Sequence, residues 1–126
     1  MDAWEPALRD RVLRLQFDAQ RDAYAEQYPG AQERMILRDG SPVGWVIVDR
    51  TSLSLHGIDI ALLSDQRSQG IGARVIRALQ EEAAVGRRPM VISVFRSNVR
   101  AIALYLRLGF RKISEDDVQT HMEWRR

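Results

Sequence analysis

The sequence predicts a mixed α/β fold, in which helices and strands pack in layers around one core. Three observations indicate this class. Residues 6 to about 27 carry apolar side chains at helical spacing, several later segments have the short apolar runs of strands, and a turn with two glycines directly precedes a second helical run. The order of elements is helix, three strands, helix, strand, helix and two strands. Because the chain has 126 residues, we expect one domain, residues 1–126, rather than two.

The first predicted helix is followed by a hairpin. The helix is indicated by apolar residues three or four positions apart, namely Leu8, Val12, Leu15 and Ala19. The tripeptide YPG at residues 28–30 ends it, because proline and glycine do not continue a helix. The next segment, ERMILRDGSPVGWVIVDR, predicts two strands joined by a turn around Asp39 and Gly40, a dipeptide that tight turns favour.

The middle of the chain predicts a strand, a helix and another strand. The segment LSLHGIDIALL, residues 53–63, is long enough to cross the centre of a sheet. The helix after it stops at Gly86 and has one apolar face, formed by Val75, Ile76, Leu79 and Ala83. The segment PMVISVF, residues 89–95, is almost continuously apolar, which predicts a strand buried on both faces.

The last third of the chain predicts one helix and two strands. The segment SNVRAIALYLRLGF, residues 97–110, forms a helix with Asn98 as its N-cap and Gly109 at its end. Strands are expected at residues 110–114 and 119–124.

Composition excludes several classes of site. The chain has no cysteine, which rules out disulfides and thiol catalysis, and its two histidines, His56 and His121, are isolated, so we expect no metal site. Its 19 basic and 17 acidic residues are interspersed, the formal net charge is +2, and no basic stripe with aromatic residues indicates nucleic-acid binding. No segment resembles a signal peptide or a membrane span, so we expect a cytoplasmic protein without a membrane partner.

A glycine-rich turn before the second helix predicts an anion site. The first N–H groups of a helix have no partner within the helix, and they lie at the positive end of its dipole. Gly70 and Gly72 let a phosphate approach these groups without meeting a Cβ. The turn lacks the Lys-Ser/Thr of a P-loop and the third glycine of a dinucleotide fingerprint. Taken without its context, a Gly-x-Gly of this kind is explained better by a tight turn than by an anion site.

Two motifs together resemble a known family. The segment RSQGIGA, residues 67–73, resembles the Arg/Gln-x-x-Gly-x-Gly/Ala signature of the GNAT superfamily of acetyl-CoA-dependent N-acetyltransferases. About 25 residues later, SVFRSNVRAIALYLRLGF resembles the family's second signature, in which an asparagine opens a helix, a tyrosine lies on it and Gly-Phe follows. The likeness runs from about residue 32 to residue 124. It implies a mainly antiparallel central sheet flanked by helices, and transfer of an acetyl group from acetyl-CoA to a primary amine.

The resemblance also implies which residues bind the cofactor. Backbone N–H groups of the loop would bind the CoA pyrophosphate; these residues are Arg67, Ser68, Gln69, Gly70, Ile71, Gly72 and Ala73. The free edge of the preceding strand, at Ile60, Ala61 and Leu62, would pair with the pantetheine arm, and an N–H at or near Ile60 would polarise the thioester carbonyl. Asn98 would hydrogen-bond the cofactor, although an N-cap role alone would also explain it.

The same resemblance implies a general acid, and chemistry requires a base. Tyr105 would protonate the departing CoA thiolate, unless it is only a core aromatic. His56 occupies the position of a glutamate that serves as the base in some relatives, and Asp59 is the rival. Side chains alternate along a strand, which places Asp59 on the opposite face from His56. His56 then shares its face with Ile58 and Ile60, so a histidine that is only packed there explains the residue as well as a base does. Proton loss to solvent is the third alternative.

The N-terminus departs from the family pattern. Relatives usually begin with a strand and a helix before the first helix predicted here, and that segment helps to wall the amine pocket. We therefore expect a minimal domain, a shortened chain, or completion by a partner, for example as a homodimer. Gln20, Tyr24 and Tyr28 are candidate contacts for an amine of open identity. The alternative function is a non-catalytic acyl-CoA-binding or interaction module on the same fold.

Overall fold

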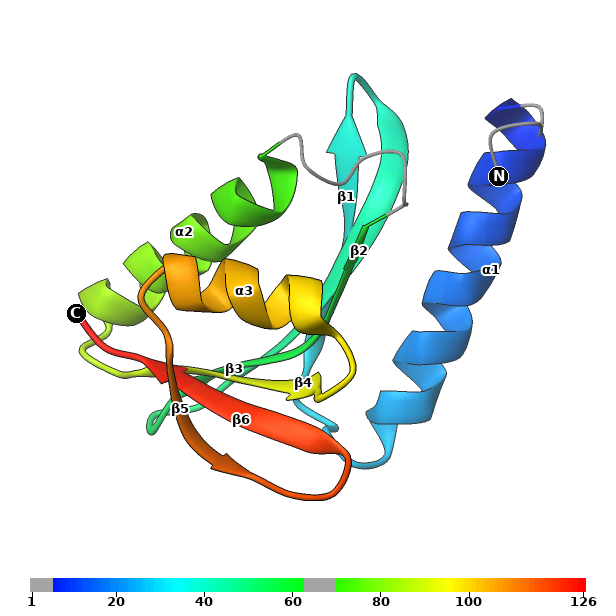
Figure 1. The fold of residues 1–126 in the computed structure, drawn as a ribbon. Helices are drawn as coiled ribbons and strands as arrows, with labels where there is room; N and C mark the ends of the chain where they lie inside the picture. The colour runs from blue at the N-terminus through cyan, green and yellow to red at the C-terminus, as the bar shows by residue number, and fades with distance from the viewer. Residues whose placement is uncertain (1–5, 63–69) are drawn as a thin grey trace.

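The computed structural model describes residues 6–62 and 70–126. It contains the elements in the predicted order (Figure 1). The helices are α1 (Pro6–Ala25), α2 (Ile71–Val85) and α3 (Val99–Arg107). The strands are β1 (Gln32–Arg38), β2 (Ser41–Arg50), β3 (Leu55–Leu62), β4 (Met90–Phe95), β5 (Arg111–Glu115) and β6 (Gln119–Trp124). The predicted mixed α/β class is confirmed.

The strands form one six-stranded sheet in the order β1-β2-β3-β4-β6-β5. All neighbouring pairs are antiparallel except β3 and β4, which are parallel and are joined through α2. A parallel pair needs such a crossover, whereas antiparallel neighbours can be joined by a short turn, as β1 and β2 are. The hairpin between β1 and β2 turns at Asp39 and Gly40, both with positive φ, as the sequence predicts.

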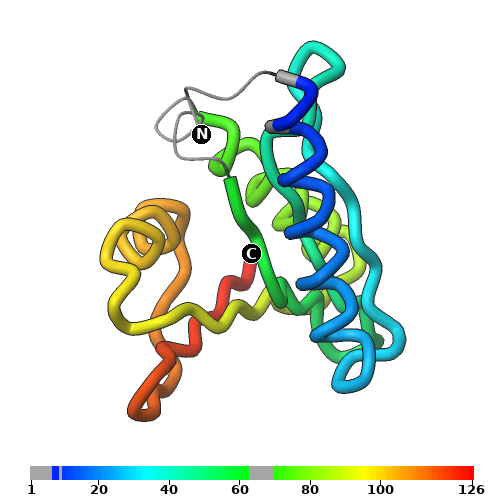
Figure 2. The backbone as a smooth tube through the Cα atoms, turned by 90° about the vertical axis from the view of Figure 1, so that its right-hand side faces the viewer, coloured from blue at the N-terminus to red at the C-terminus, as the bar shows by residue number. Residues whose placement is uncertain are grey.

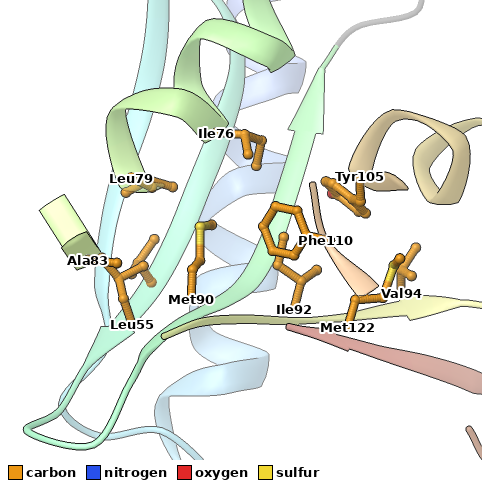
Figure 3. Packing of buried hydrophobic residues seen from close by; sticks show 11 residues of the cluster. Leu55, Ile76, Leu79, Ala83, Met90, Ile92, Val94, Tyr105, Phe110 and Met122 are labelled. Carbon is orange, nitrogen blue, oxygen red and sulfur yellow. The ribbon is translucent and has the colours of Figure 1, made fainter. Parts of the chain in front are cut away.

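The main core lies between the sheet and the pair α2 and α3 (Figure 3). Leu55, Ala83 and Met90 at its centre are 0% exposed. Burial of a leucine or methionine side chain contributes about 1.5–3 kcal/mol, so this layer holds the two halves of the sheet together. A smaller layer lies on the other face, where Leu13 and Phe17 of α1 are buried and the Phe17 ring lies 6.3 Å from that of Trp45.

The parallel pair β3 and β4 separates after three residues. Leu55, His56 and Gly57 pair with Met90, Val91 and Ile92. Beyond this point β3 continues to pair with β2, and β4 with β6. Figure 2 shows β3 (green) and β4 (yellow) diverging from their common start. The centre of the sheet therefore opens into a fork, and the backbone of β3 is unpaired on its β4 side among the described residues.

A β-bulge lies at the same point on β3. Ile47 of β2 is opposite Asp59, but the next residue, Val48, is opposite Gly57, so Ile58 is an extra residue in β3. A bulge resets the alternation of side chains, because two residues on one strand oppose one on the other.

The bulge corrects one prediction about the two candidate bases. His56 pairs with Asp49 and Asp59 pairs with Ile47, two β2 residues on the same face, so both lie on the α1 side of the sheet. Ile60 packs instead against the core under α2 and α3. The prediction that Asp59 lies opposite His56, and that His56 shares the face of Ile60, is wrong, since strict alternation does not hold across Ile58.

A second correction concerns β4. The strand was predicted to be buried on both faces, but only Met90, Ile92 and Val94 are buried, whereas Phe95 is 57% exposed. The physical reason is the position of α1, which packs on β2 and not over β4 (Figures 1 and 2). The α1-side face of β4 and β6 therefore carries half-buried, mostly polar side chains.

We predict that Gly44→Ala will destabilise the domain. A Cβ at Gly44 would lie 2.1 Å from the carbonyl oxygen of Ala61, so β2 and β3 would have to move apart beside the fork. The free energy of unfolding should fall by about 1–3 kcal/mol, the usual cost of forcing backbone shifts, in urea denaturation. Gly30→Ala is the control, because its Cβ would meet only a side-chain atom of Asp49 at 3.5 Å. Equal stability of both variants would contradict the tight packing of Gly44.

Candidate functional site

The unpaired edge of β3 forms the first part of the candidate site. Ile60, Ala61 and Leu62 pair with Val46, Trp45 and Gly44 on β2, and the structure shows no partner on their other side among the described residues. A free strand edge presents N–H and C=O groups that can pair with an extended ligand as with an added strand. The structure therefore places the three predicted edge residues together, and those of their N–H and C=O groups that point away from β2 have no partner among the described residues.

The N-terminus of α2 forms the second part. Gly70 precedes the helix with φ of 78°, and nothing lies within 4 Å of the position where its Cβ would be. No side chain of residues 6–62 or 70–126 caps the helix, and a helical bond runs from the N–H of Arg74 to the oxygen of Gly70. The N–H groups of Ile71, Gly72 and Ala73 therefore point out of the helix end without a helical partner. Together with the helix dipole they can bind a phosphate.

These two parts of the site are adjacent in space. A Cβ at Gly72 would lie 3.5 Å from Cδ1 of Leu62, the last residue of β3, and 3.7 Å from Cδ2 of Leu104 on α3. An extended ligand paired with the edge of β3 would thus reach the start of α2 with its phosphate end. The other residues predicted to bind the pyrophosphate lie outside the described residues; they are Arg67, Ser68 and Gln69.

Asn98 acts as the N-cap of α3, as predicted. Its side-chain oxygen accepts a hydrogen bond from the N–H of Ala101 at 3.1 Å. The amide NH₂ group is not used by this bond, and the side chain is exposed, so it can donate to a ligand as well.

Tyr105 extends from α3 into the core toward β3 (Figure 3). It is 6% exposed, and its ring lies 5.6 Å from the ring of Phe110. Burial, together with the negative charge of Asp59, raises the pKa of Tyr105 to about 12. The side chain is thus packed as a core aromatic and remains protonated at all physiological pH values.

His56 and Asp59 both retain the capacity to accept a proton. Burial lowers the pKa of His56, whose ring lies edge-on to that of Tyr28 with the centroids 5.5 Å apart. Burial raises the pKa of Asp59, while the hydrogen bond that Oδ2 accepts from Nε1 of Trp45, at 3.0 Å, opposes the shift. At neutral pH the imidazole is therefore mainly neutral and the carboxylate is a stronger base than in water.

A cavity of about 230 Å³ lies on the same face, between the end of α1 and strands β1 and β2. It is lined by Arg21, Asp22, Tyr24, Ala25, Tyr28, Pro29, Ala31, Glu33 and Ile47. Two tyrosines of this lining are near the candidate bases. Tyr28 packs on His56. The pKa of Tyr24 is raised mainly by burial and secondly by the negative charge of Asp59. Gln20, the third predicted amine contact, is exposed and does not line the cavity.

Sequence reasoning missed one group of polar residues beside the fork. Ser93 Oγ lies 2.9 Å from Nδ1 of His121, whose Nε2 lies 3.0 Å from Oδ2 of Asp116. These residues come from β4, β6 and the turn before β6, and only the pairing of Ser93 with His121 across β4 and β6 brings them together. No spacing in the sequence indicates such a group, so His121 looked isolated.

Two classes of site are absent from the described ranges 6–62 and 70–126. No three histidine, aspartate or glutamate side chains in these ranges are grouped so that they could hold a metal ion. No helix in the same ranges is long and apolar enough to cross a membrane.

Comparisons with known proteins agree with this geometry. Residues 1–110 match the sequence profile of the family described as the acetyltransferase (GNAT) family. The fold is similar to that of the PaiA N-acetyltransferase from Thermoplasma acidophilum in complex with coenzyme A (15% identity, 85% of this chain and 68% of that chain covered, TM-score 0.69). It is also similar to a GNAT family acetyltransferase from Elizabethkingia anophelis with acetyl-CoA bound (19% identity, 90% and 86% covered, TM-score 0.66). A third similar structure is the ribosomal-protein-S18-alanine N-acetyltransferase from Escherichia coli (21% identity, 82% and 74% covered, TM-score 0.68).

We predict that Gly72→Glu will weaken CoA binding at least tenfold. The added carboxylate would lie among N–H groups that would otherwise bind the phosphates, and it would repel them. Isothermal titration calorimetry on a variant with a wild-type circular dichroism spectrum measures the effect. Gly72→Gln is the matched control, because it adds similar bulk without charge and should lose less affinity. Unchanged affinity of Gly72→Glu would show that the N-terminus of α2 does not hold the phosphates.

Proposed function

Because the chain belongs to the GNAT family of acetyltransferases, we propose that it transfers the acetyl group of acetyl-CoA directly to a primary amine. The family uses acetyl-CoA as its cosubstrate. The observation that carries the proposal is that the free edge of β3 ends beside the N-terminus of α2, where a Cβ built on Gly72 would lie 3.5 Å from the side chain of Leu62. A strand edge that leads to a phosphate cradle suits a ligand with an extended arm and a pyrophosphate.

Each end of the cofactor has a group of residues to hold it in this proposal. The N–H groups of Ile71, Gly72 and Ala73 bind the pyrophosphate, together with the residues of the loop before them. The pantetheine arm pairs with the edge at Ile60, Ala61 and Leu62, and Asn98 donates its free amide N–H to the cofactor. The N–H at or near Ile60 lies along the same edge and stabilises the oxyanion that forms from the thioester carbonyl.

The acetyl transfer moves protons as well as an acyl group. An ammonium ion must first lose a proton, since only the neutral amine has a lone pair for attack. The nitrogen then bonds to the carbonyl carbon, the carbon–sulfur bond breaks, and the thiolate leaves with the electrons of that bond. Asp59 or His56 takes the first proton, because both lie on the α1 side of the fork. Burial raises the pKa of Asp59, which makes its carboxylate a stronger base, and lowers the pKa of His56, which keeps its imidazole neutral and able to accept a proton.

Tyr105 is the proposed general acid. Its pKa of about 12 lies above the usual thiol value of about 8.5, so full proton transfer to the thiolate would be uphill by roughly 5 kcal/mol. Burial is the larger cause of this value and the charge of Asp59 is the second. When Asp59 accepts a proton, its charge disappears and Tyr105 becomes a stronger acid. Uptake of the amine's proton is therefore coupled to donation toward sulfur.

The cavity beside α1 supports an amine as acceptor. Carboxylates and aromatic rings attract ammonium ions, and Glu33, Tyr24 and Tyr28 line it. Asp22 lines it too, but its carboxylate lies 3.6 Å from Nε of Arg21, which is also in the lining. It opens on the face that carries His56 and Asp59, opposite the face covered by α2 and α3. Incubation with acetyl-CoA and a panel of amines and peptides, with a free-thiol assay, tests the whole proposal.

A second candidate function is a non-catalytic acyl-CoA-binding module. The tight packing of Tyr105 against Phe110 favours it, since this packing would hold the ring whether or not its hydroxyl serves chemistry. CoA binding in calorimetry without thiol release from any amine of the panel would identify this function.

We predict that Tyr105→Phe will lower kcat about 10²-fold or more, the usual contribution of a general acid. The change removes only the hydroxyl, so packing on Phe110 and the affinity for acetyl-CoA should persist. Because the pKa of Tyr105 is about 12, its ionisation should cause no decline in wild-type rate between pH 7 and 10. Steady-state kinetics and CoA calorimetry give both readouts. Full turnover by the variant would make Tyr105 a core residue only.

The base can be assigned by comparing His56→Ala with Asp59→Asn. Removing the base should lower the rate mainly at neutral pH, and high pH should partly rescue it because the amine then deprotonates unaided. As the pH is lowered, the wild-type rate should fall when the base becomes protonated. If His56 is the base, this fall comes below its ordinary pKa of 6.5, because burial lowers that pKa. If Asp59 is the base, the fall comes above its ordinary pKa of 3.8, because burial raises that pKa. If a variant keeps the wild-type pH profile, the residue that it replaces is not the base. Two such profiles would indicate proton loss to solvent.

A further inference from the structure

Ser93, His121 and Asp116 form a chain of hydrogen bonds that the proposed mechanism does not use. Ser93 Oγ lies 2.9 Å from Nδ1 of His121, and Nε2 of the same ring lies 3.0 Å from Oδ2 of Asp116. The His121 side chain is 31% exposed, and that of Asp116 is 57% exposed. The chain thus runs from a half-buried hydroxyl to a carboxylate in solvent.

The hydrogen bonds fix which atom carries each proton. The other oxygen of Asp116, Oδ1, accepts from the N–H of Val118 at 2.8 Å and from the N–H of Gln119 at 2.7 Å. These bonds, and the one from His121, lower the pKa of Asp116 to about 2, so the carboxylate is ionised and can only accept. Nε2 of His121 must therefore carry a hydrogen. In the neutral ring Nδ1 is then the acceptor, and Ser93 donates its hydroxyl proton to it.

Ser93 is the first residue of β4 beyond the fork. The last residue pair that joins β3 to β4 is Gly57 and Ile92. Ile92 faces the core under α2 and α3, so Ser93 faces the α1 side, as His56 and Asp59 do. Asp59 and Ser93 therefore border the opening from its two arms, on the same face. With its proton directed to His121, the Ser93 oxygen has a lone pair available to a donor in the opening.

The charged groups around His121 come from every neighbouring strand. Asp116 binds it from the turn. His56 on β3 and its pairing partner Asp49 on β2 face the same side of the sheet. The ion pair of Arg111 and Glu123 lies one row away on β5 and β6. Arg96 pairs with Glu115 near the turn.

We propose that Ser93, His121 and Asp116 form a proton relay that removes the second proton from the acceptor nitrogen during acetyl transfer. The proposal rests on the proposed function. A primary ammonium ion loses two protons on its way to an amide, the first before attack and the second from the nitrogen of the tetrahedral intermediate. Asp59 or His56 takes the first from the β3 side.

The second proton leaves through β4. It passes from nitrogen to Ser93 Oγ while the hydroxyl proton of Ser93 passes to Nδ1 of His121. The imidazolium that forms is stabilised by Asp116 and releases a proton to water at its exposed edge. The nitrogen loses two protons in all. One of them balances the proton that Tyr105 gives to sulfur, and the other is released to solvent as the net H⁺ of the reaction.

The test compares Ser93→Ala and His121→Gln with Ser114→Ala, measuring kcat and KM for a reactive amine from pH 6 to 9.5. We expect a loss in kcat of about 10²-fold for the first two, with KM within threefold of wild type. The loss should persist at pH 9, unlike that from removing the first base, because deprotonation of the free amine does not replace the second step. Ser114→Ala is the matched control, since Ser114 flanks His121 from β5 and should have wild-type kinetics. Ser93→Thr, which keeps the hydroxyl, should restore activity.

A purely structural bridge between β4 and β6 would give a different result. The variants would then lose stability in urea denaturation but keep the wild-type kcat at temperatures where they are folded, which would overturn the proposal. The imidazole ¹⁵N NMR signals of His121 provide a readout independent of activity, and a hydrogen on Nδ1 rather than Nε2 would also overturn it. If the wild-type protein releases no thiol with any amine while NMR shows the Nε2–H form, the proposed function itself fails, and the relay fails with it.

Discussion

The separation of β3 from β4 is the constraint on which the rest of the structure depends. Adjacent parallel strands normally satisfy each other's backbone along their whole length, yet here only three residue pairs do so. Gly57, the last residue of β3 that pairs with β4, is followed directly by the bulged Ile58. A bulge increases local twist, which turns the rest of β3 with β2 and away from β4. The cost is an unpaired strand edge in the middle of a sheet, and the benefit is a place where an extended ligand can pair.

Each side chain of the candidate site takes its role from its position relative to this fork. Ile60 points into the core and anchors the edge, while β3 at this position pairs with β2 and has no partner on its β4 side among the described residues. Asp59 and His56 face the other side, the side of α1, where burial shifts their pKa values and Tyr28, just after α1, packs on His56. Tyr105 approaches from α3. The cofactor and the amine can therefore approach from opposite faces of one sheet, and the charge of Asp59 acts on groups of both sides.

Much of the fold could be predicted from the sequence, because its signals are local. The caps at Asn98 and Gly86, the turn at Asp39 and Gly40, and the helical spacing within α1 and α2 each depend on residues a few positions apart. The same holds for the anion cradle, since glycines at the start of a helix act through the backbone of their own segment. The element order and the resemblance to the GNAT family followed from these local patterns and are confirmed.

The sequence by itself determined the elements, their caps and the resemblance to the GNAT family. Only the tertiary structure decided that His56 and Asp59 share a face, that β4 is covered on one side, and that Ser93 meets His121. The physical reason is that strand faces are set by register. A single extra residue, Ile58, reverses the alternation that a sequence pattern assumes, and the pairing of β4 with β6 joins residues 28 positions apart that share no local signal.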